Sequence, residues 1–162
     1  MNRRRSIIPL FLTAVTLLLW TCDSIDCTLN NIVLCRANFY GSDGSAVSIT
    51  APLTVTTCGV DSVLINQQSG TSEMKLPLSY WQNEDTLVLT VTGDDYSIRD
   101  TIWIAKTNTP HFESPDCPTS MFHIISEVRT THSFIDSVTI IKPLVNYEET
   151  ENLQIYLRTA AD

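Results

Sequence analysis

Apolar and polar side chains alternate along most of the chain after residue 21, and this alternation predicts β-strands. A period of two places every second side chain on the same face, as in a strand that is buried on one side. Three runs show the pattern best, and their apolar residues are Val33, Cys35, Ala37 and Phe39; Leu87, Leu89 and Val91; and Leu153, Ile155 and Leu157. The pattern predicts an all-β protein.

Turn signals separate these runs at 41–44, 68–70, 93–95 and 108–110, where Gly, Pro, Asn, Asp and Ser gather. The abundance of Val, Ile, Thr and Tyr suits pleated sheets. Eight or nine short strands in about 140 residues is the spacing of an antiparallel sandwich. We therefore expect an antiparallel immunoglobulin-like β-sandwich of about 7–9 strands over residues 27–158, with a C-terminal tail at 159–162.

The segment 119–130 has two interpretations. Phe122, Ile125 and Val128 would form one stripe of a helix, whereas Phe122, Ile124 and Val128 would point inward from a strand. The Val, Ile and Thr content of the segment favours the strand.

The N-terminus has the layout of an export signal. Three arginines at 3–5 precede an apolar run of 14 residues, 7–20, which is shorter than the ~18–20 residues of a membrane-spanning helix. The next residues, Leu19-Trp20-Thr21-Cys22, resemble the bacterial lipobox, although Trp20 and Thr21 are large for their places. We expect a signal peptide at 1–21, then a tether at 22–26 whose Cys22 carries the lipid, with palmitate among its acyl chains. An ordinary secretory signal or an uncleaved anchor are the alternatives.

Composition indicates one globular domain and excludes one class of partner. Apolar residues make up 43% of the chain and charged residues 17%. The formal charge is −8, and without the first 21 residues it is −11, from 7 basic and 18 acidic side chains. Such a surface repels nucleic acid, so no nucleic-acid partner is expected.

The cysteines suit an exported protein. If Cys22 is lipidated, four cysteines remain, and an even number allows two disulfides in three connectivities. We favour Cys27 with Cys117 and Cys35 with Cys58. The alternative for Cys35 is a buried free thiol, because it shares the apolar face of its predicted strand.

An aspartate, a hydroxyl residue and an aliphatic residue follow one another five times, starting at Asp23, Asp61, Asp85, Asp100 and Asp136. Aspartate and Ser or Thr side chains end turns through local hydrogen bonds, so most of these triplets are expected to begin strands. The triplet also resembles an O-glycosylation motif of Gram-negative gut bacteria. The acceptors would be Ser24, Ser62, Thr86, Thr101 and Ser137.

Candidate chemistry is sparse. His111, His123 and His132 lie within 22 residues, but their spacing matches no metal-ligand motif. No nucleophile or phosphate-loop motif is present either. We therefore expect no cofactor, no metal and no catalytic activity.

Aromatic residues and one loop motif supply the candidate ligand surface. Trp81 and Trp103 fall at a strand end and opposite an aliphatic face, respectively, and exposed aromatics stack on sugars or partner proteins. Trp103 could instead pack into a second face of the core. His111 and Glu113 belong to Pro110-His111-Phe112-Glu113-Ser114, and loops often carry function.

Nine short segments spread over the mature chain carry a family resemblance: Asp26-Cys27, Trp103-Ile104, Lys106–Asn108, Pro110–Ser114, Asp116-Cys117, Met121–His123, Ile135–Ser137, Asn146-Tyr147 and Glu151–Leu153. With these segments the chain resembles an uncharacterised, Bacteroides-type family of small gut-bacterial lipoproteins. The resemblance implies a lipid-anchored, β-rich envelope protein, expected in the outer membrane, and it supports pairing of Cys27 with Cys117. It supplies no activity.

Together these observations predict a non-catalytic structural or partner-binding module whose partners are the membrane, through its lipid, and another envelope protein or glycan. The alternative is a glycan-binding accessory module, and a metal-binding protein or a hydrolase is a more distant one.

Overall fold

The computed structural model describes residues 32–59 and 62–158. The predicted signal peptide, the tether, the tail and the residues Cys22, Ser24 and Cys27 lie outside the described residues. Within them the chain forms ten strands: β1 (Cys35–Tyr40), β2 (Leu53–Thr57), β3 (Val63–Gln68), β4 (Glu73–Leu76), β5 (Glu84–Thr92), β6 (Ser97–His111), β7 (Ser120–Thr130), β8 (Ile135–Ile140), β9 (Leu144–Val145) and β10 (Leu153–Leu157).

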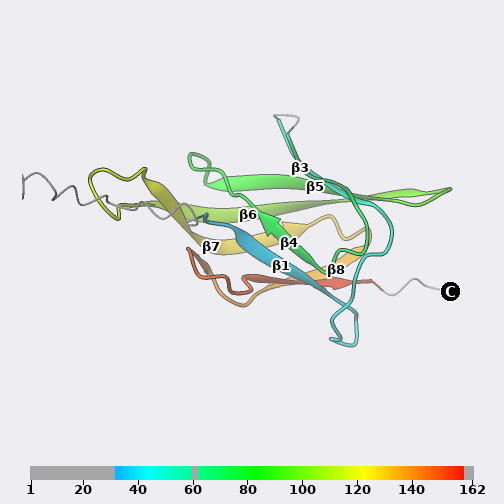
Figure 1. The fold of residues 1–162 in the computed structure, drawn as a ribbon. Helices are drawn as coiled ribbons and strands as arrows, with labels where there is room; N and C mark the ends of the chain where they lie inside the picture. The colour runs from blue at the N-terminus through cyan, green and yellow to red at the C-terminus, as the bar shows by residue number, and fades with distance from the viewer. Residues whose placement is uncertain (1–31, 60–61, 159–162) are drawn as a thin grey trace, which may run out of the picture.

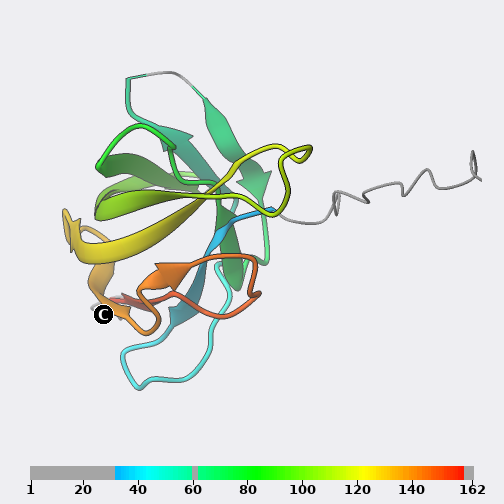
Figure 2. The ribbon, with the colours of Figure 1, turned by 90° about the vertical axis from the view of Figure 1, so that its left-hand side faces the viewer.

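The strands form two sheets that stack in two layers, so the all-β prediction is confirmed. One sheet has the order β4-β1-β10-β8 and the other the order β3-β2-β5-β6-β7-β9. Figure 1 shows β5 and β6 above β1 and β8, and Figure 2 shows the same layers from the side. The expectation of a wholly antiparallel fold is wrong at one place, because β1 and β10 pair in parallel. These strands lie far apart in sequence, so the long connection that parallel strands need is available.

The core fills the space between the sheets, and the alternation read from the sequence identifies much of it. Cys35, Ala37 and Phe39 on β1 face Leu87 and Leu89 on β5 across the core, and all five are buried. Burial of such apolar surface is the main driving force for this fold.

β7 is a strand, as expected, but its inward residues differ from the prediction. His123 and Ile125 are buried, whereas Ile124 points outward and is 47% exposed. The pairing of β6 with β7 shifts between Ala105 and Lys106, which leaves Ser126 as an extra residue. This bulge returns Val128 to the core side, where it packs against the buried cluster.

The turn predicted at 108–110 does not form, because β6 continues through Pro110 to His111. β6 pairs with β5 only up to Ala105, and beyond the bond from Lys106 N–H to the Asn83 carbonyl no strand of the described residues pairs with this edge at Pro110. Proline lacks an N–H group and is tolerated where a strand edge has no ladder partner.

The repeated aspartates do not share one role. Asp85 and Asp136 lie near the start of β5 and β8, as expected of residues that begin strands. Asp100 instead lies inside β6 and is buried. Its carboxylate accepts backbone N–H groups of Ser133 at 2.8 Å and Ile135 at 2.8 Å, and thereby fixes the connection from β7 to β8. These hydrogen bonds lower the pKa of Asp100 against the opposing effect of its burial.

The predicted disulfide between Cys35 and Cys58 is wrong, because both are free thiols. Cys35 is buried on the inner face of β1, where burial, aided by the charge of Asp85, raises its pKa to about 12. Cys58 follows β2 in the other sheet and is exposed. The pairing of Cys27 with Cys117 stays a prediction, since Cys27 lies outside the described residues.

Candidate binding site

The loop that joins β4 to β5, residues 77–83, presents two large aromatic side chains to solvent. Trp81 is 88% exposed and Tyr80 is 47% exposed. Aromatic residues bury most of their surface in folded proteins, and an exposed cluster marks a surface that contacts a partner. Trp81 was expected to contribute to a ligand surface, and that role stays a prediction.

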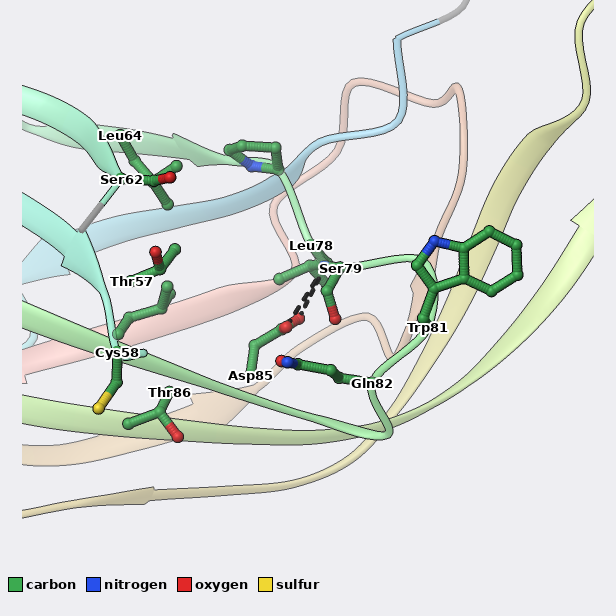
Figure 3. Close-up of a pocket in the computed structure, with 12 residues that line it drawn as sticks. Thr57, Cys58, Ser62, Leu64, Leu78, Ser79, Trp81, Gln82, Asp85 and Thr86 are labelled. Carbon is green, nitrogen blue, oxygen red and sulfur yellow. Dashed lines mark hydrogen bonds between the residues drawn. The ribbon is translucent and has the colours of Figure 1, made fainter. Parts of the chain in front are cut away.

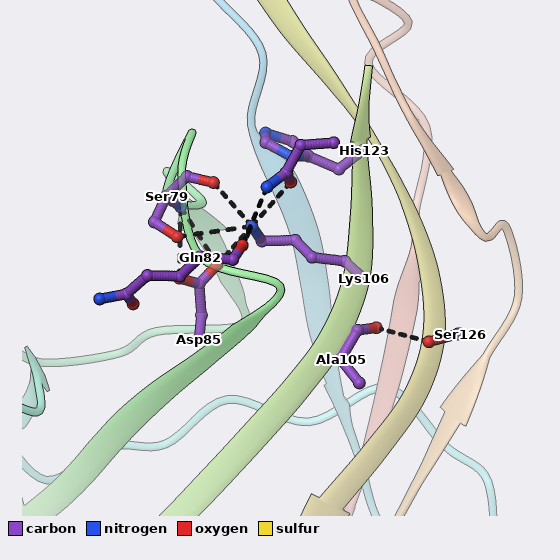
Figure 4. Close-up of polar contacts among 8 residues, drawn as sticks. Ser79, Gln82, Asp85, Ala105, Lys106, His123 and Ser126 are labelled. Atoms are coloured by element: carbon purple, nitrogen blue, oxygen red, sulfur yellow. Dashed lines mark hydrogen bonds and ion pairs between the residues drawn. The ribbon is translucent and has the colours of Figure 1, made fainter.

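A buried lysine holds this loop through hydrogen bonds to its backbone. Lys106 extends from the inner face of β6 and is 3% exposed. Its Nζ donates hydrogen bonds to the backbone carbonyl of Ser79 at 2.6 Å and to that of Gln82 at 2.7 Å. Figure 4 shows the ammonium group surrounded by these acceptors. The two carbonyls stand on either side of Tyr80-Trp81, so a single charge fixes both ends of the aromatic segment.

Asp85, near the start of β5, completes the support of the loop. Its carboxylate forms an ion pair with Lys106 Nζ at 3.4 Å and accepts the backbone N–H of Ser79 at 3.1 Å. Both side chains are almost fully buried. Burial lowers the pKa of Lys106, and the nearby charge of Asp85 opposes that change. The opposite charge of Asp85 therefore keeps the ammonium group compatible with a dry interior.

Asn108 links the loop to the rest of the site. Its Oδ1 accepts a hydrogen bond from Lys106 Nζ at 2.9 Å, and its Nδ2 donates to the Gln82 carbonyl at 2.9 Å. The backbone N–H of Lys106 donates to the Asn83 carbonyl at 2.7 Å. We call the three side chains Lys106, Asp85 and Asn108 the loop clamp.

His123 lies next to the loop clamp in a neutral form. Its Nδ1 is 2.8 Å from Asn108 Oδ1, which can only accept, so Nδ1 carries the proton. Burial and the positive charge of Lys106 lower the pKa of His123 to about 4. Among the described residues, nothing forms a hydrogen bond with its buried Nε2. The Tyr80 ring lies beside it, at 6.4 Å between ring centroids.

A pocket of about 380 Å³ lies beside the loop and reaches towards the ends of β2 and β3. In Figure 3, Trp81 stands at one end, Cys58 and Thr86 lie at the other, and Gln82 and Asp85 lie between them. The lining mixes hydroxyl, amide and apolar groups: Thr57, Cys58, Ser62, Leu64, Pro77, Leu78, Ser79, Trp81, Gln82, Asp85, Thr86 and Leu87. The volume is at the lower end of the range for small-molecule sites, about 300–1,000 Å³.

The other residues predicted for a ligand surface do not line this pocket. Trp103 is half-buried on the outer face of β6, where the Arg129 guanidinium lies 5.5 Å from its ring centroid. It therefore does not pack into the core. His111 stacks on Phe122 with ring centroids 4.3 Å apart, and Glu113 is exposed in the loop that follows β6.

The predicted glycan acceptors that the structure describes differ in accessibility. Ser62 and Ser137 are exposed, whereas Thr86 and Thr101 are half-buried within β5 and β6. Ser62 and Thr86 also line the pocket.

The histidines have separate environments. His132 Nδ1 lies 2.7 Å from the carbonyl oxygen of Asp136 on an exposed turn. His123, in contrast, is buried. Within 32–59 and 62–158, no three metal-ligating side chains gather. That part of the chain also contains no helix long and apolar enough to cross a bilayer.

The sequence analysis missed the loop clamp, although the alternation contains a signal for it. Lys106 continues the inward series of Ile102 and Ile104, and Asp85 precedes Leu87 on the same face of β5. A lysine and an aspartate at buried positions of adjacent strands indicate a buried ion pair, because an unpaired charge there is costly.

Comparison with known families places the chain in a group without an assigned activity. Residues 52–157 match the model of a family of unknown function, DUF6452, and the chain belongs to this family. The match spans the loop clamp and every residue of the pocket lining. No curated protein and no solved structure matches the chain.

Proposed function

We propose that this member of DUF6452 is a non-catalytic binding module, and that it contacts its partner through the Tyr80–Trp81 loop and the adjacent pocket. The observation that carries the proposal is the loop clamp. A fully buried lysine donates to the carbonyls of Ser79 and Gln82, on both sides of two exposed aromatic residues. A loop held so firmly loses little conformational freedom when a ligand binds.

The chemistry of the loop suits recognition. Tryptophan and tyrosine are the residues that most often contribute large shares of binding energy at interfaces. Such contacts work best when their side chains are rigidly presented and exposed before binding. Trp81 is exposed before binding, and the loop clamp holds the backbone around it in a fixed position.

The proposal of a non-catalytic role rests on how the acidic group in the pocket is used. Among the described residues that line the pocket, Asp85 is the carboxylate, and it is already engaged by Lys106 and by the N–H of Ser79. A carboxylate held in this way is poorly placed to act as a general base, because it is already engaged by a buried ammonium group and a backbone donor.

We further propose that the module is a lipoprotein of the bacterial envelope, anchored by Cys22 in the outer membrane. The support comes from the arginines at 3–5, the apolar run at 7–20 and the lipobox-like 19–22. The same proposal includes a Cys27–Cys117 disulfide. It also includes an immunoglobulin-like arrangement of the two sheets, which the stacked layers and their shared core support.

Detergent phase partitioning tests the anchor. The full chain expressed in a Gram-negative host should enter the detergent phase, and Cys22→Ala should move it to the aqueous phase. Partitioning that is unchanged by the substitution would contradict lipidation at Cys22.

Site-directed photo-cross-linking tests the binding surface. A photoreactive phenylalanine in place of Tyr80 should give a defined adduct in native envelopes. The matched control places the same group at Phe112, which is 68% exposed but lies outside the pocket lining. Equal adducts at both positions, or none at either, would overturn the proposed surface.

A further inference from the structure

We infer that the pocket beside Trp81 binds an uncharged saccharide ring; this inference rests on the proposed function and names its ligand class. The argument combines the charge of the lining, its hydrogen-bonding groups and the place of Trp81.

Among the described residues, the pocket lining offers no free charge to a ligand. Its charged residue is Asp85, whose carboxylate is matched by the ammonium of Lys106 at 3.4 Å. An anionic ligand would be repelled by the strongly acidic chain, whose net charge is −8. A cationic ligand would have to compete with Lys106 for a carboxylate that is only 8% exposed. The electrostatics therefore favour a neutral ligand.

The polar groups of the pocket match a ligand that carries many hydroxyls. The lining residues Ser62 and Thr86 carry hydroxyl groups that can both donate and accept, and Gln82 carries an amide with both functions. An apolar partner side chain in this place would leave these groups without hydrogen bonds, at a cost of about 1–3 kcal/mol for each buried group. A saccharide can satisfy them, because its hydroxyls also donate and accept.

The remaining surface suits the apolar side of a sugar ring. Leu64, Leu78 and Leu87 contribute apolar lining, and Trp81 stands at the rim with its indole accessible. A pyranose has C–H groups on its faces and hydroxyls around its edge, so it can stack on the indole while its edge reaches Gln82. The loop clamp holds this platform in place before binding.

Trp81 fluorescence reports directly on the proposed site. Outside the predicted signal peptide, Trp81 and Trp103 are the tryptophans of the chain. A Trp103→Phe version of the full-length lipoprotein in detergent micelles thus leaves Trp81 as the reporter once the signal is removed. The probes are a panel of neutral oligosaccharides built from glucose, mannose, galactose, xylose and N-acetylglucosamine, and the matching uronic acids.

We expect saturable changes with a neutral saccharide and weaker or no response to the uronic acid of the same linkage. Calorimetry on the chain with the native Trp103 should show that Trp81→Ala weakens binding by about 5–10-fold, which is the size of one aromatic contact. Trp81→Phe should retain most of the affinity, and Phe112→Ala should retain all of it. Equal binding of uronic acids, no response to any neutral saccharide, or unchanged binding by Trp81→Ala would each overturn the inference.

The two proposals fail in different ways. A protein adduct at position 80 with no saccharide response would overturn the saccharide inference and leave the binding module standing. No adduct and no saccharide response would overturn both.

Discussion

Replacing Lys106 by methionine should be one of the most destabilising single changes in this protein. Methionine matches the length and apolar character of the lysine stem, so the change removes the charge and its hydrogen bonds with little loss of packing. It leaves the Ser79 carbonyl without its donor, removes one of the two donors to the Gln82 carbonyl, and leaves the Asp85 carboxylate without its counterion.

The magnitude follows from the burial of both charges. The Lys106 side chain is 0% exposed and that of Asp85 is 8% exposed, and removing one partner of such a pair costs about 3–5 kcal/mol. The free energy of unfolding of a domain of this size is about 5–15 kcal/mol, so this loss would remove a large part of its stability. With a urea dependence of about 1–3 kcal/mol per molar, the midpoint should fall by more than about 1 M.

The assay is urea unfolding of a double-mutant cycle formed by Lys106→Met, Asp85→Leu and the double variant. The double variant should be far more stable than the sum of the single effects implies, because it removes both charges together. Lys75→Met is the matched control, since Lys75 is exposed on β4 and should change the stability by no more than about 0.5 kcal/mol. A loss below about 1 kcal/mol for Lys106→Met, or additive effects in the cycle, would refute the reasoning.

Three further predictions concern other buried groups. Asp100→Asn should cost about 2–3 kcal/mol in urea unfolding, because the amide replaces one accepting oxygen, while exposed Asp136→Asn stays within about 0.5 kcal/mol. Iodoacetamide should label Cys58 in the native protein and Cys35 only after denaturation; an intact-mass loss of two hydrogens from a Cys35–Cys58 bond would contradict this. His123 should make the protein less stable as the pH falls from about 6.5 towards 4, since the unfolded chain takes up a proton that the folded imidazole refuses. His123→Gln should flatten that slope between pH 7 and 5, and an unchanged slope would contradict the assignment.

The sequence predicts the fold class and most of the core because the same alternation of apolar and polar residues determines both. Period-two alternation identifies the buried faces of β1 and β5 without any tertiary information. It fails on β7, where a bulge at Ser126 changes which residues face inward. A bulge depends on how two strands pair, and a pattern within one strand does not report that pairing.

The candidate site was only half predictable. Exposed Trp81 could be found as an aromatic residue at a strand end, whereas its support depends on two strands and a loop that meet only in the folded chain. Lys106 and Asn108 come from β6 and Asp85 comes from β5. The charges and burial of Lys106 and Asp85 could be read from the alternation, but their convergence on the backbone of the loop could not.

The loop clamp also explains why a costly buried pair occupies this position. Two apolar side chains of similar volume would stabilise the core as well or better, so stability alone does not account for Lys106 and Asp85. Apolar side chains cannot donate to the carbonyls of Ser79 and Gln82, however, and those bonds define where Tyr80-Trp81 sits. The double variant Lys106→Met with Asp85→Leu should therefore separate two properties. It should stay folded with most of its stability, and it should bind the ligand of Trp81 less tightly because the loop is no longer held. If the double variant is stable and binds as tightly as the native chain, the pair has no role in positioning the loop.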